Sequence, residues 1–286
     1  MPVSDMPTSP LLEGLRFAEA PRWHRDRLWF SDIFAHRVMS VDISGHAEVV
    51  VDLGRDLPSG LGFLPDETML IVCLNRPVIL ALSPRGDLRV HADLTRLAVG
   101  GLNDMVVDSE GRAYVGSMGT HDSMLPRPLD GDGNVILVEP DGSAKVVADH
   151  LDAPNGPCIT RDGSTYVVAE FPASRLAGFD RLPDGTLTRR RVWADLRPGS
   201  ADGITVDSMD AIWVASPRQH ECRRVLEGGI VTDRVQVGDR MPLACALGGP
   251  DGRTLFVLSA IGGEAAIRDR TCTSVIETVS VDVPAW

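Results

Sequence analysis

The stretch NDMVVDSEGRAYVG, residues 103–116, is one copy of a unit that recurs along the chain. A polar residue opens a half-apolar run, a turn rich in Asp and Gly follows, and a strongly β-prone run such as AYVG comes next. Copies begin at residues 19, 59, 103, 155, 202 and 244, so successive copies lie 40 to 52 residues apart. Repeats of this length with about four short strands each are typical of propeller blades.

The repeat therefore predicts an all-β fold, a six-bladed β-propeller with four-stranded antiparallel blades around a central channel. We find no long apolar stripe at helical spacing that would argue otherwise. The copies predict a single propeller domain over residues 1–286, with residues 1–10 as a loose lead-in. Residues 11–17 have strand character, so we expect an N-terminal strand to complete the last blade and close the ring.

Composition narrows the class of partner. The net charge of −12 argues against nucleic acid, because phosphate binding needs a basic face. No apolar run approaches the ~20 residues of a membrane helix, and the N-terminus lacks the pattern of a secretory signal. Five widely spaced cysteines without a C-x-x-C motif suit reduced thiols. We expect a cytoplasmic protein that acts on a small molecule without nucleic-acid or membrane partners, and its oligomeric state stays open.

Four polar residues occupy the opening position of copies one, three, four and five: Glu19, Asn103, Asn155 and Asp202. In a propeller the first strand of each blade lines the channel, so these side chains should converge. Their oxygen atoms suit one divalent ion, Ca²⁺, Mg²⁺ or Mn²⁺, and Zn²⁺ also accepts carboxylate oxygen. Asn-Gly and Asp-Gly alone are typical of turns, but the shared register favours a metal site.

At this point the chain resembles the regucalcin (senescence marker protein), gluconolactonase and luciferin-regenerating enzyme family of six-bladed propellers. The resemblance covers essentially the whole chain. It rests on EAPRW at 19–23 with LWFSD at 28–32, ND at 103–104 with GRAYVGSM at 111–118, PNG at 154–156, and ADGI at 201–204.

The resemblance implies that Glu19, Asn155 and Asp202 hold one divalent metal, Ca²⁺ in the first place. It implies that Asn103 lies near the metal on the substrate side and that Asp202 serves as general base. Many members are similar to lactonases, so the expected activity is metal-dependent hydrolysis of a lactone or related cyclic ester. A cation that polarises the carbonyl and acidifies water, with a carboxylate to accept the proton, fits that chemistry.

Two substrate-side positions depart from the family pattern. Gly101 stands where sugar-lactone members resemble one another in having an arginine, and His121 falls on an acidic position. Loss of an arginine fork and gain of an imidazole change a polyol pocket. We therefore expect a smaller or more apolar lactone or ester. His121 is a candidate acid or base, or an ordinary loop histidine.

Two alternatives remain. The same metal site could support lyase or isomerase chemistry in a biosynthetic pathway, with His121 transferring the proton. Alternatively, the propeller could bind a metal or small ligand without catalysis. Fold alone does not choose among them, because propellers support many activities.

Overall fold

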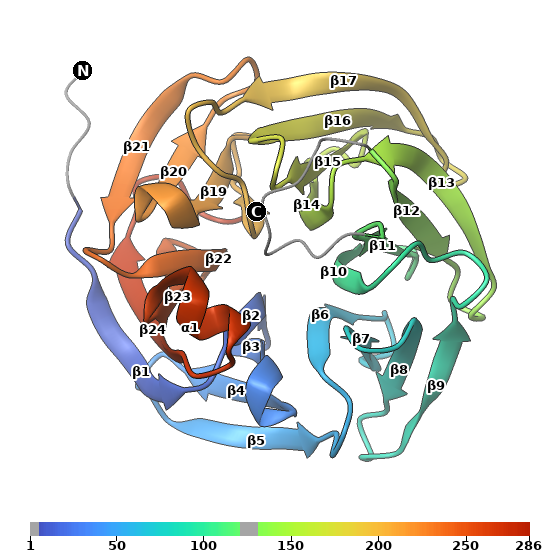
Figure 1. Ribbon diagram of the computed structural model, residues 1–286, viewed down its shortest axis with the longest axis horizontal. Helices are drawn as coiled ribbons and strands as arrows, with labels where there is room; N and C mark the ends of the chain where they lie inside the picture. Colours follow the sequence, from blue (N-terminus) through green and yellow to red (C-terminus); the bar gives the residue numbers. More distant parts are fainter. Residues whose placement is uncertain (1–5, 121–130) are drawn as a thin grey trace.

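The computed structural model describes residues 6–120 and 131–286. Its strands form six antiparallel four-stranded sheets arranged as a ring, which confirms the predicted six-bladed propeller (Figure 1). Blades one to three consist of β2 (Ala18–His24), β3 (Arg27–Asp32), β4 (Arg37–Asp42), β5 (Ala47–Asp52), β6 (Pro58–Phe63), β7 (Met69–Cys73), β8 (Val78–Leu82), β9 (Leu88–Asp93), β10 (Leu102–Val107), β11 (Ala113–Ser117), β12 (Gly133–Val138) and β13 (Ala144–Leu151).

The remaining blades follow the same order, from the channel outward. They consist of β14 (Pro154–Ile159), β15 (Thr165–Glu170), β16 (Arg175–Arg181), β17 (Leu187–Asp195), β18 (Ile204–Val206), β19 (Ile212–Ser216), β20 (Glu221–Val225), β21 (Val231–Gln236), β22 (Met241–Gly248), β23 (Thr254–Ile261), β24 (Thr273–Ser280) and β1 (Ser9–Leu15).

The N-terminal strand closes the ring, as predicted. β1 pairs with β24 as the outermost strand of the sixth blade. The strand begins at Ser9, so it includes two residues that we expected in the lead-in. Pairing the two ends of the chain within one sheet leaves no open blade between β24 and β2.

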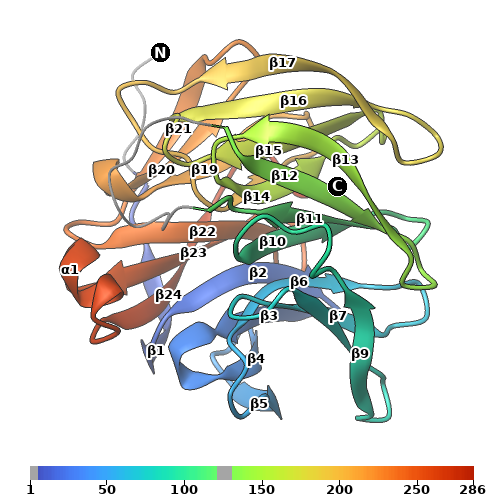
Figure 2. The same cartoon turned by 45° about the vertical axis from the view of Figure 1, so that its right-hand side comes forward.

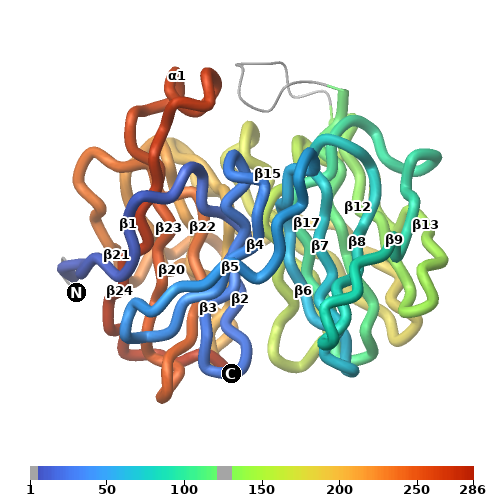
Figure 3. The backbone as a smooth tube through the Cα atoms, turned by 90° about the horizontal axis from the view of Figure 1, so that it is seen from below, coloured from blue at the N-terminus to red at the C-terminus, as the bar shows by residue number. Residues whose placement is uncertain are grey.

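Helical structure in the described residues is limited to three short segments: η1 (Ile33–Ala35), η2 (Pro217–Gln219) and α1 (Gly263–Arg268). None has the length and apolar character needed to cross a membrane. Figure 3 shows α1 on one face of the ring and the C-terminus on the opposite face. We call the α1 face the upper face.

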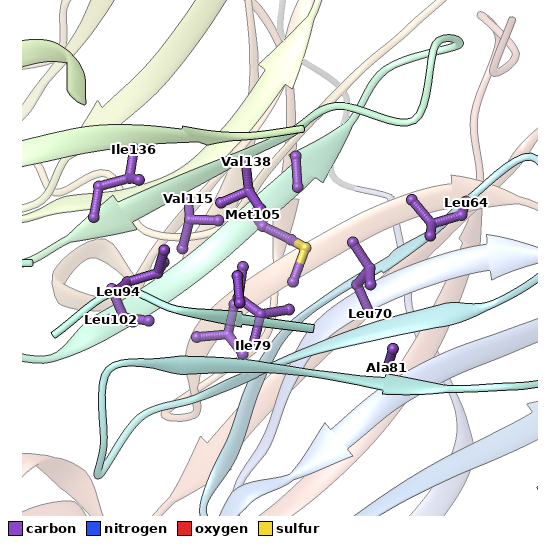
Figure 4. Close-up of a cluster of buried hydrophobic side chains, with 13 residues drawn as sticks. Leu64, Leu70, Ile79, Ala81, Leu94, Leu102, Met105, Val115, Ile136 and Val138 are labelled. Carbon is purple, nitrogen blue, oxygen red and sulfur yellow. The ribbon is translucent and has the colours of Figure 1, made fainter. Parts of the chain in front are cut away.

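Apolar side chains fill the space between neighbouring blades. One cluster joins blades two and three, where Leu70 and Ile79 pack with Met105 and Val115 (Figure 4). Comparable clusters lie between the other blades. The aromatic residues expected at matching strand positions follow this pattern. Tyr114, Tyr166, Trp213 and Phe256 are buried, whereas Trp29 is only partly buried.

Candidate functional site

The inner strands share an irregularity near their upper ends. A β-bulge interrupts the pairing of five of them, within Glu19–Arg22, Pro58–Leu61, Leu102–Met105, Pro154–Pro157 and Pro242–Ala244. A bulge re-aims side chains and increases local twist, and bulges are common beside active sites. The predicted residues Glu19, Asn103 and Asn155 lie within three of these bulges, in the inner strands β2, β10 and β14 (Figure 2).

Asp202 reaches the same level in the fifth blade just before β18. Its backbone N–H donates to the Ala215 carbonyl at 3.0 Å, which extends the pairing of the blade beyond Ile204. Ser59 occupies the equivalent position in the second blade. In the sixth blade the carbonyl of Leu243 accepts the Gly203 N–H at 2.8 Å. Leu243 is therefore the equivalent residue, one position earlier than the repeat predicted.

The glycines after Asn155 and Asp202 are required by packing rather than by turns. A Cβ atom at Gly156 would lie 2.6 Å from the Ile204 nitrogen of the next blade. A Cβ atom at Gly203 would lie 2.5 Å from the Ala244 Cβ. Both glycines have ordinary negative-φ backbones. The Asn-Gly and Asp-Gly pairs therefore lie where inner strands approach one another closely, and the turn interpretation is wrong here.

Two carboxylates at this level influence each other. Burial raises the pKa of Glu19 to about 8, and the nearby negative charge of Asp104 adds to this, although the Ala20 N–H donates to its Oε2 at 2.9 Å. Burial also raises the pKa of Asp202 well above its usual range, and the charge of Glu19 reinforces the shift. A hydrogen bond with the Asn155 side chain acts in the opposite direction on Asp202.

Asp104 is a third acidic group near the channel axis that the sequence interpretation missed. Its Oδ1 accepts a hydrogen bond from Arg22 at 2.7 Å, and Arg22 Nη1 also donates to the Pro21 carbonyl at 2.7 Å. Asp104 occupies a position that is glycine in blades two, four and five: Gly60, Gly156 and Gly203. That departure from glycine was the available signal.

The residues predicted to lie on the substrate side are near the same level. Asn103 Oδ1 accepts a hydrogen bond from the Ser59 hydroxyl at 3.4 Å. Gly101 lies two residues above Asn103, and its carbonyl accepts the Met118 N–H at 2.9 Å. His121 lies outside the described residues.

The donor set suits a hard divalent cation. It offers two carboxylates, Glu19 and Asp202, and the amide of Asn155, all oxygen ligands of the kind that Ca²⁺ prefers. No three His, Cys, Asp or Glu residues cluster for a metal within residues 6–120 and 131–286, so the set includes an amide beside the two carboxylates. When ionised, Glu19, Asp104 and Asp202 outnumber the nearby Arg22 by two charges, and a divalent ion balances two charges. The residues therefore fit the group.

A separate cavity of about 570 Å³ occupies the lower end of the channel. It is lined by Arg22, the lower parts of the inner strands and the C-terminal Trp286. Arg22 thus lies between this cavity and the carboxylates above it. The candidate metal ligands do not line the cavity.

The chain is similar in sequence to a known protein family and to individual proteins. The sequence profile described as the SMP-30/Gluconolactonase/LRE-like region matches residues 17–261. One relative is a 6-deoxy-6-sulfogluconolactonase of Pseudomonas putida, 26% identical, with 93% of this chain and 91% of the relative covered. Another is the pentonolactonase XacC of Haloferax volcanii, 28% identical, covering 86% and 82%.

A solved structure has the same fold. The calcium-binding protein regucalcin of Agrobacterium tumefaciens superposes with a TM-score of 0.78 and 22% sequence identity. The match covers 99% of this chain and 98% of that one.

Proposed function

This chain belongs to the SMP-30/gluconolactonase/LRE-like family, and from that premise we propose that it hydrolyses a lactone or related cyclic ester with one divalent metal ion. The observation that carries the proposal is the pair of mutually repelling carboxylates, Glu19 and Asp202, at the upper end of the channel. Two sequence relatives are named as lactonases, which supports this class of reaction. A regucalcin with this fold is a calcium-binding protein, which makes Ca²⁺ the first ion to test.

In the proposed site Glu19, Asn155 and Asp202 hold the ion. When bound, a divalent cation polarises an ester carbonyl and lowers the pKa of nearby water. The residues then divide the remaining work. Asn103 orients the substrate through its amide, which can donate and accept hydrogen bonds.

Asp202 is the proposed general base. Its carboxylate would accept a proton from the attacking water. The water oxygen bonds to the carbonyl carbon, the ring C–O bond breaks, and the departing ring oxygen takes the proton held by Asp202. Without a cation, burial and the Glu19 charge keep the Asp202 pKa high and favour its protonated form. Base activity and metal occupancy should therefore rise together.

Asp104 and Arg22 are proposed positioning residues below this level. Asp104 holds the Arg22 guanidinium at 2.7 Å, and that positive charge lowers the pKa of Glu19. Arg22 therefore favours the ionised form of Glu19, whereas the negative charge of Asp104 opposes it.

A lactone panel tests the proposal. Protein purified free of metal and reloaded with Ca²⁺, Mg²⁺, Mn²⁺ or Zn²⁺ is assayed beside the Asp202→Asn variant. We expect turnover only with metal and a loss of at least about a thousandfold in kcat for the variant. Equal rates for wild type and variant would exclude the mechanism. Stoichiometric metal binding without turnover of any lactone would instead favour a non-catalytic binding propeller.

A further inference from the structure

Six residues directly above the level of Glu19 and Asp202, one in each blade, form a layer without a charged side chain. Residues two positions apart share a side of an inner strand wherever the backbone is extended. The layer consists of the residue two positions before Glu19 and the equivalent residue in each other blade. These are Phe17, Leu57, Gly101, Ala153, Ser200 and Met241.

Only two residues of this layer keep appreciable solvent exposure. Leu57, Ala153, Ser200 and Met241 are buried, whereas Phe17 and Gly101 are partly exposed. The Ser200 hydroxyl is already engaged, since it donates to Gln219 at 3.1 Å and accepts the Arg218 N–H at 3.2 Å. The surface that this layer offers a ligand is therefore an aromatic ring and a glycine.

Packing around Gly101 is tight, so a side chain at this position would have to displace its neighbours. A Cβ atom at Gly101 would lie 3.1 Å from the Met118 methyl carbon and 3.3 Å from the Leu74 carbonyl oxygen. At the preceding residue, a Cβ on Gly100 would lie 1.7 Å from the Gly119 carbonyl oxygen. The segment is thus pressed against the loop that carries Met118. The partly buried thioether of Met118 occupies the space into which a side chain at residue 101 would extend.

Phe17, in the first blade, is the other partly exposed residue of this layer. Its ring stacks on Phe34 with centroids 4.6 Å apart. Both rings pack against a buried cluster under α1: Met241, Leu243, Ala260, Ile267 and Cys272. Leu243 is the residue of the sixth blade at the level of Glu19 and Asp202. The apolar packing behind Phe17 therefore extends from the level of Glu19 and Asp202 up to α1.

We propose that the substrate is a lactone whose ring carries an alkyl substituent, and that Phe17 and the Gly101–Met118 contact select it. The inference rests on the lactonase function proposed above and specifies its substrate class. A sugar lactone presents several hydroxyl groups, and each one buried without a partner costs free energy. An alkyl chain in the same place gains free energy with each buried methylene.

Three lactones with the same ring size separate these classes: unsubstituted γ-butyrolactone, γ-nonalactone and D-galactono-γ-lactone. With the metal-loaded protein we expect kcat/KM for γ-nonalactone to exceed that for γ-butyrolactone by roughly tenfold or more. The polyhydroxylated lactone should be the poorest of the three. The Phe17→Ser variant should lower kcat/KM for γ-nonalactone much more than kcat/KM for γ-butyrolactone, so most of the preference is lost.

Phe63→Ser is the matched control. Phe63 is also partly buried in an aromatic stack, with His24 at 3.9 Å, but it lies at the lower end of β6. It should leave the preference unchanged. Calorimetry with pentylcyclopentanone, a ketone that cannot be hydrolysed, adds a binding readout, and Phe17→Ser should weaken that binding selectively.

The outcomes separate two failures. Faster hydrolysis of D-galactono-γ-lactone than of γ-nonalactone would overturn the alkyl inference and leave the lactonase proposal standing. An equal effect of Phe17→Ser on all three lactones would also overturn it. Hydrolysis of none of them by the metal-loaded protein would remove the proposed function and this inference with it.

Discussion

Two groups of buried carboxylates in this propeller are in opposite electrostatic situations. Glu170, at the end of β15, is fully buried and accepts hydrogen bonds from Arg175 at 2.6 Å and Arg190 at 2.9 Å. It also accepts the Asp152 N–H at 2.8 Å. Glu19 and Asp202 lie at the channel with raised pKa values, and each acts on the other as a like charge.

This difference distinguishes Glu170, a carboxylate with a structural role, from Glu19 and Asp202, which are candidate functional carboxylates. A buried carboxylate surrounded by arginines and N–H groups is already neutralised and satisfied. Glu19 and Asp202 are less well compensated, with the Ala20 N–H and Arg22 acting on Glu19 and the Asn155 side chain on Asp202. Perturbed pKa values of this kind cluster at functional sites, although structural networks also produce them. The predictions below test whether the two groups respond as differently as this comparison requires.

The largest expected effect on stability is at Glu170. The Glu170→Gln substitution leaves Arg175 and Arg190 without their shared charge partner, and we expect a loss of about 3 kcal/mol in the free energy of unfolding. The matched Glu19→Gln substitution removes a repulsive charge, so the metal-free protein should be at least as stable as wild type. Urea unfolding of both metal-free variants measures the contrast, and similar losses for the two would contradict it.

A bound metal ion should stabilise only proteins in which the site of Glu19, Asn155 and Asp202 is intact. At a free Ca²⁺ concentration about 100 times the dissociation constant, linkage predicts a gain of about 2.7 kcal/mol in unfolding free energy. The gain should persist in Glu170→Gln and vanish in Glu19→Gln. Urea unfolding with and without excess Ca²⁺ checks this, and a gain that survives Glu19→Gln would place the ion elsewhere.

Close packing of the inner strands should resist even one methyl group. Gly156→Ala puts a Cβ atom 2.6 Å from the Ile204 nitrogen, so blades four and five must separate. We expect a loss of about 2 kcal/mol and weaker metal binding, because Asn155 and Asp202 belong to these strands. Gly86→Ala tests the other cause of glycine preference, since Gly86 has φ of +92° in a turn and nothing lies within 4 Å of a Cβ atom there. It should lower stability without affecting metal binding.

A pH dependence of stability follows from Glu19. Burial raises its pKa from 4.5 in the unfolded chain to about 8 in the metal-free fold. Between these values the unfolded state binds fewer protons, so unfolding free energy should fall as pH rises. Protons and metal compete for the same carboxylates, so Ca²⁺ should stabilise more at pH 8 than at pH 5.5. Thermal melts at both pH values test the sign, and stabilisation that is greater at low pH would contradict it.

The repeat made most of the fold and the polar register predictable. Equivalent positions in successive blades converge because every inner strand lines one channel, so residues about 50 positions apart in sequence become neighbours. Ring closure by the N-terminal strand followed from the same count. In blade six the bulge shifts the site-level residue from Ala244 to Leu243, and bulges are not visible in sequence.

Other features depended on tertiary contacts. Asp104 reads as an ordinary strand residue until Arg22, 82 positions earlier, is placed beside it. Asn155-Gly156 and Asp202-Gly203 look like turns because turn preference and close strand approach select the same small residue. The apolar layer also could not be predicted, because Met118 and α1 come from segments outside the inner strands.

Calorimetric titration of the metal-free protein with Ca²⁺ tests the central claim most directly. Wild type and Glu170→Gln should each bind one ion per chain with similar affinity, while Glu19→Gln and Asp202→Asn should bind none or bind at least a hundredfold more weakly. Unchanged Ca²⁺ affinity in Glu19→Gln and Asp202→Asn would contradict the assignment of these carboxylates as the metal site.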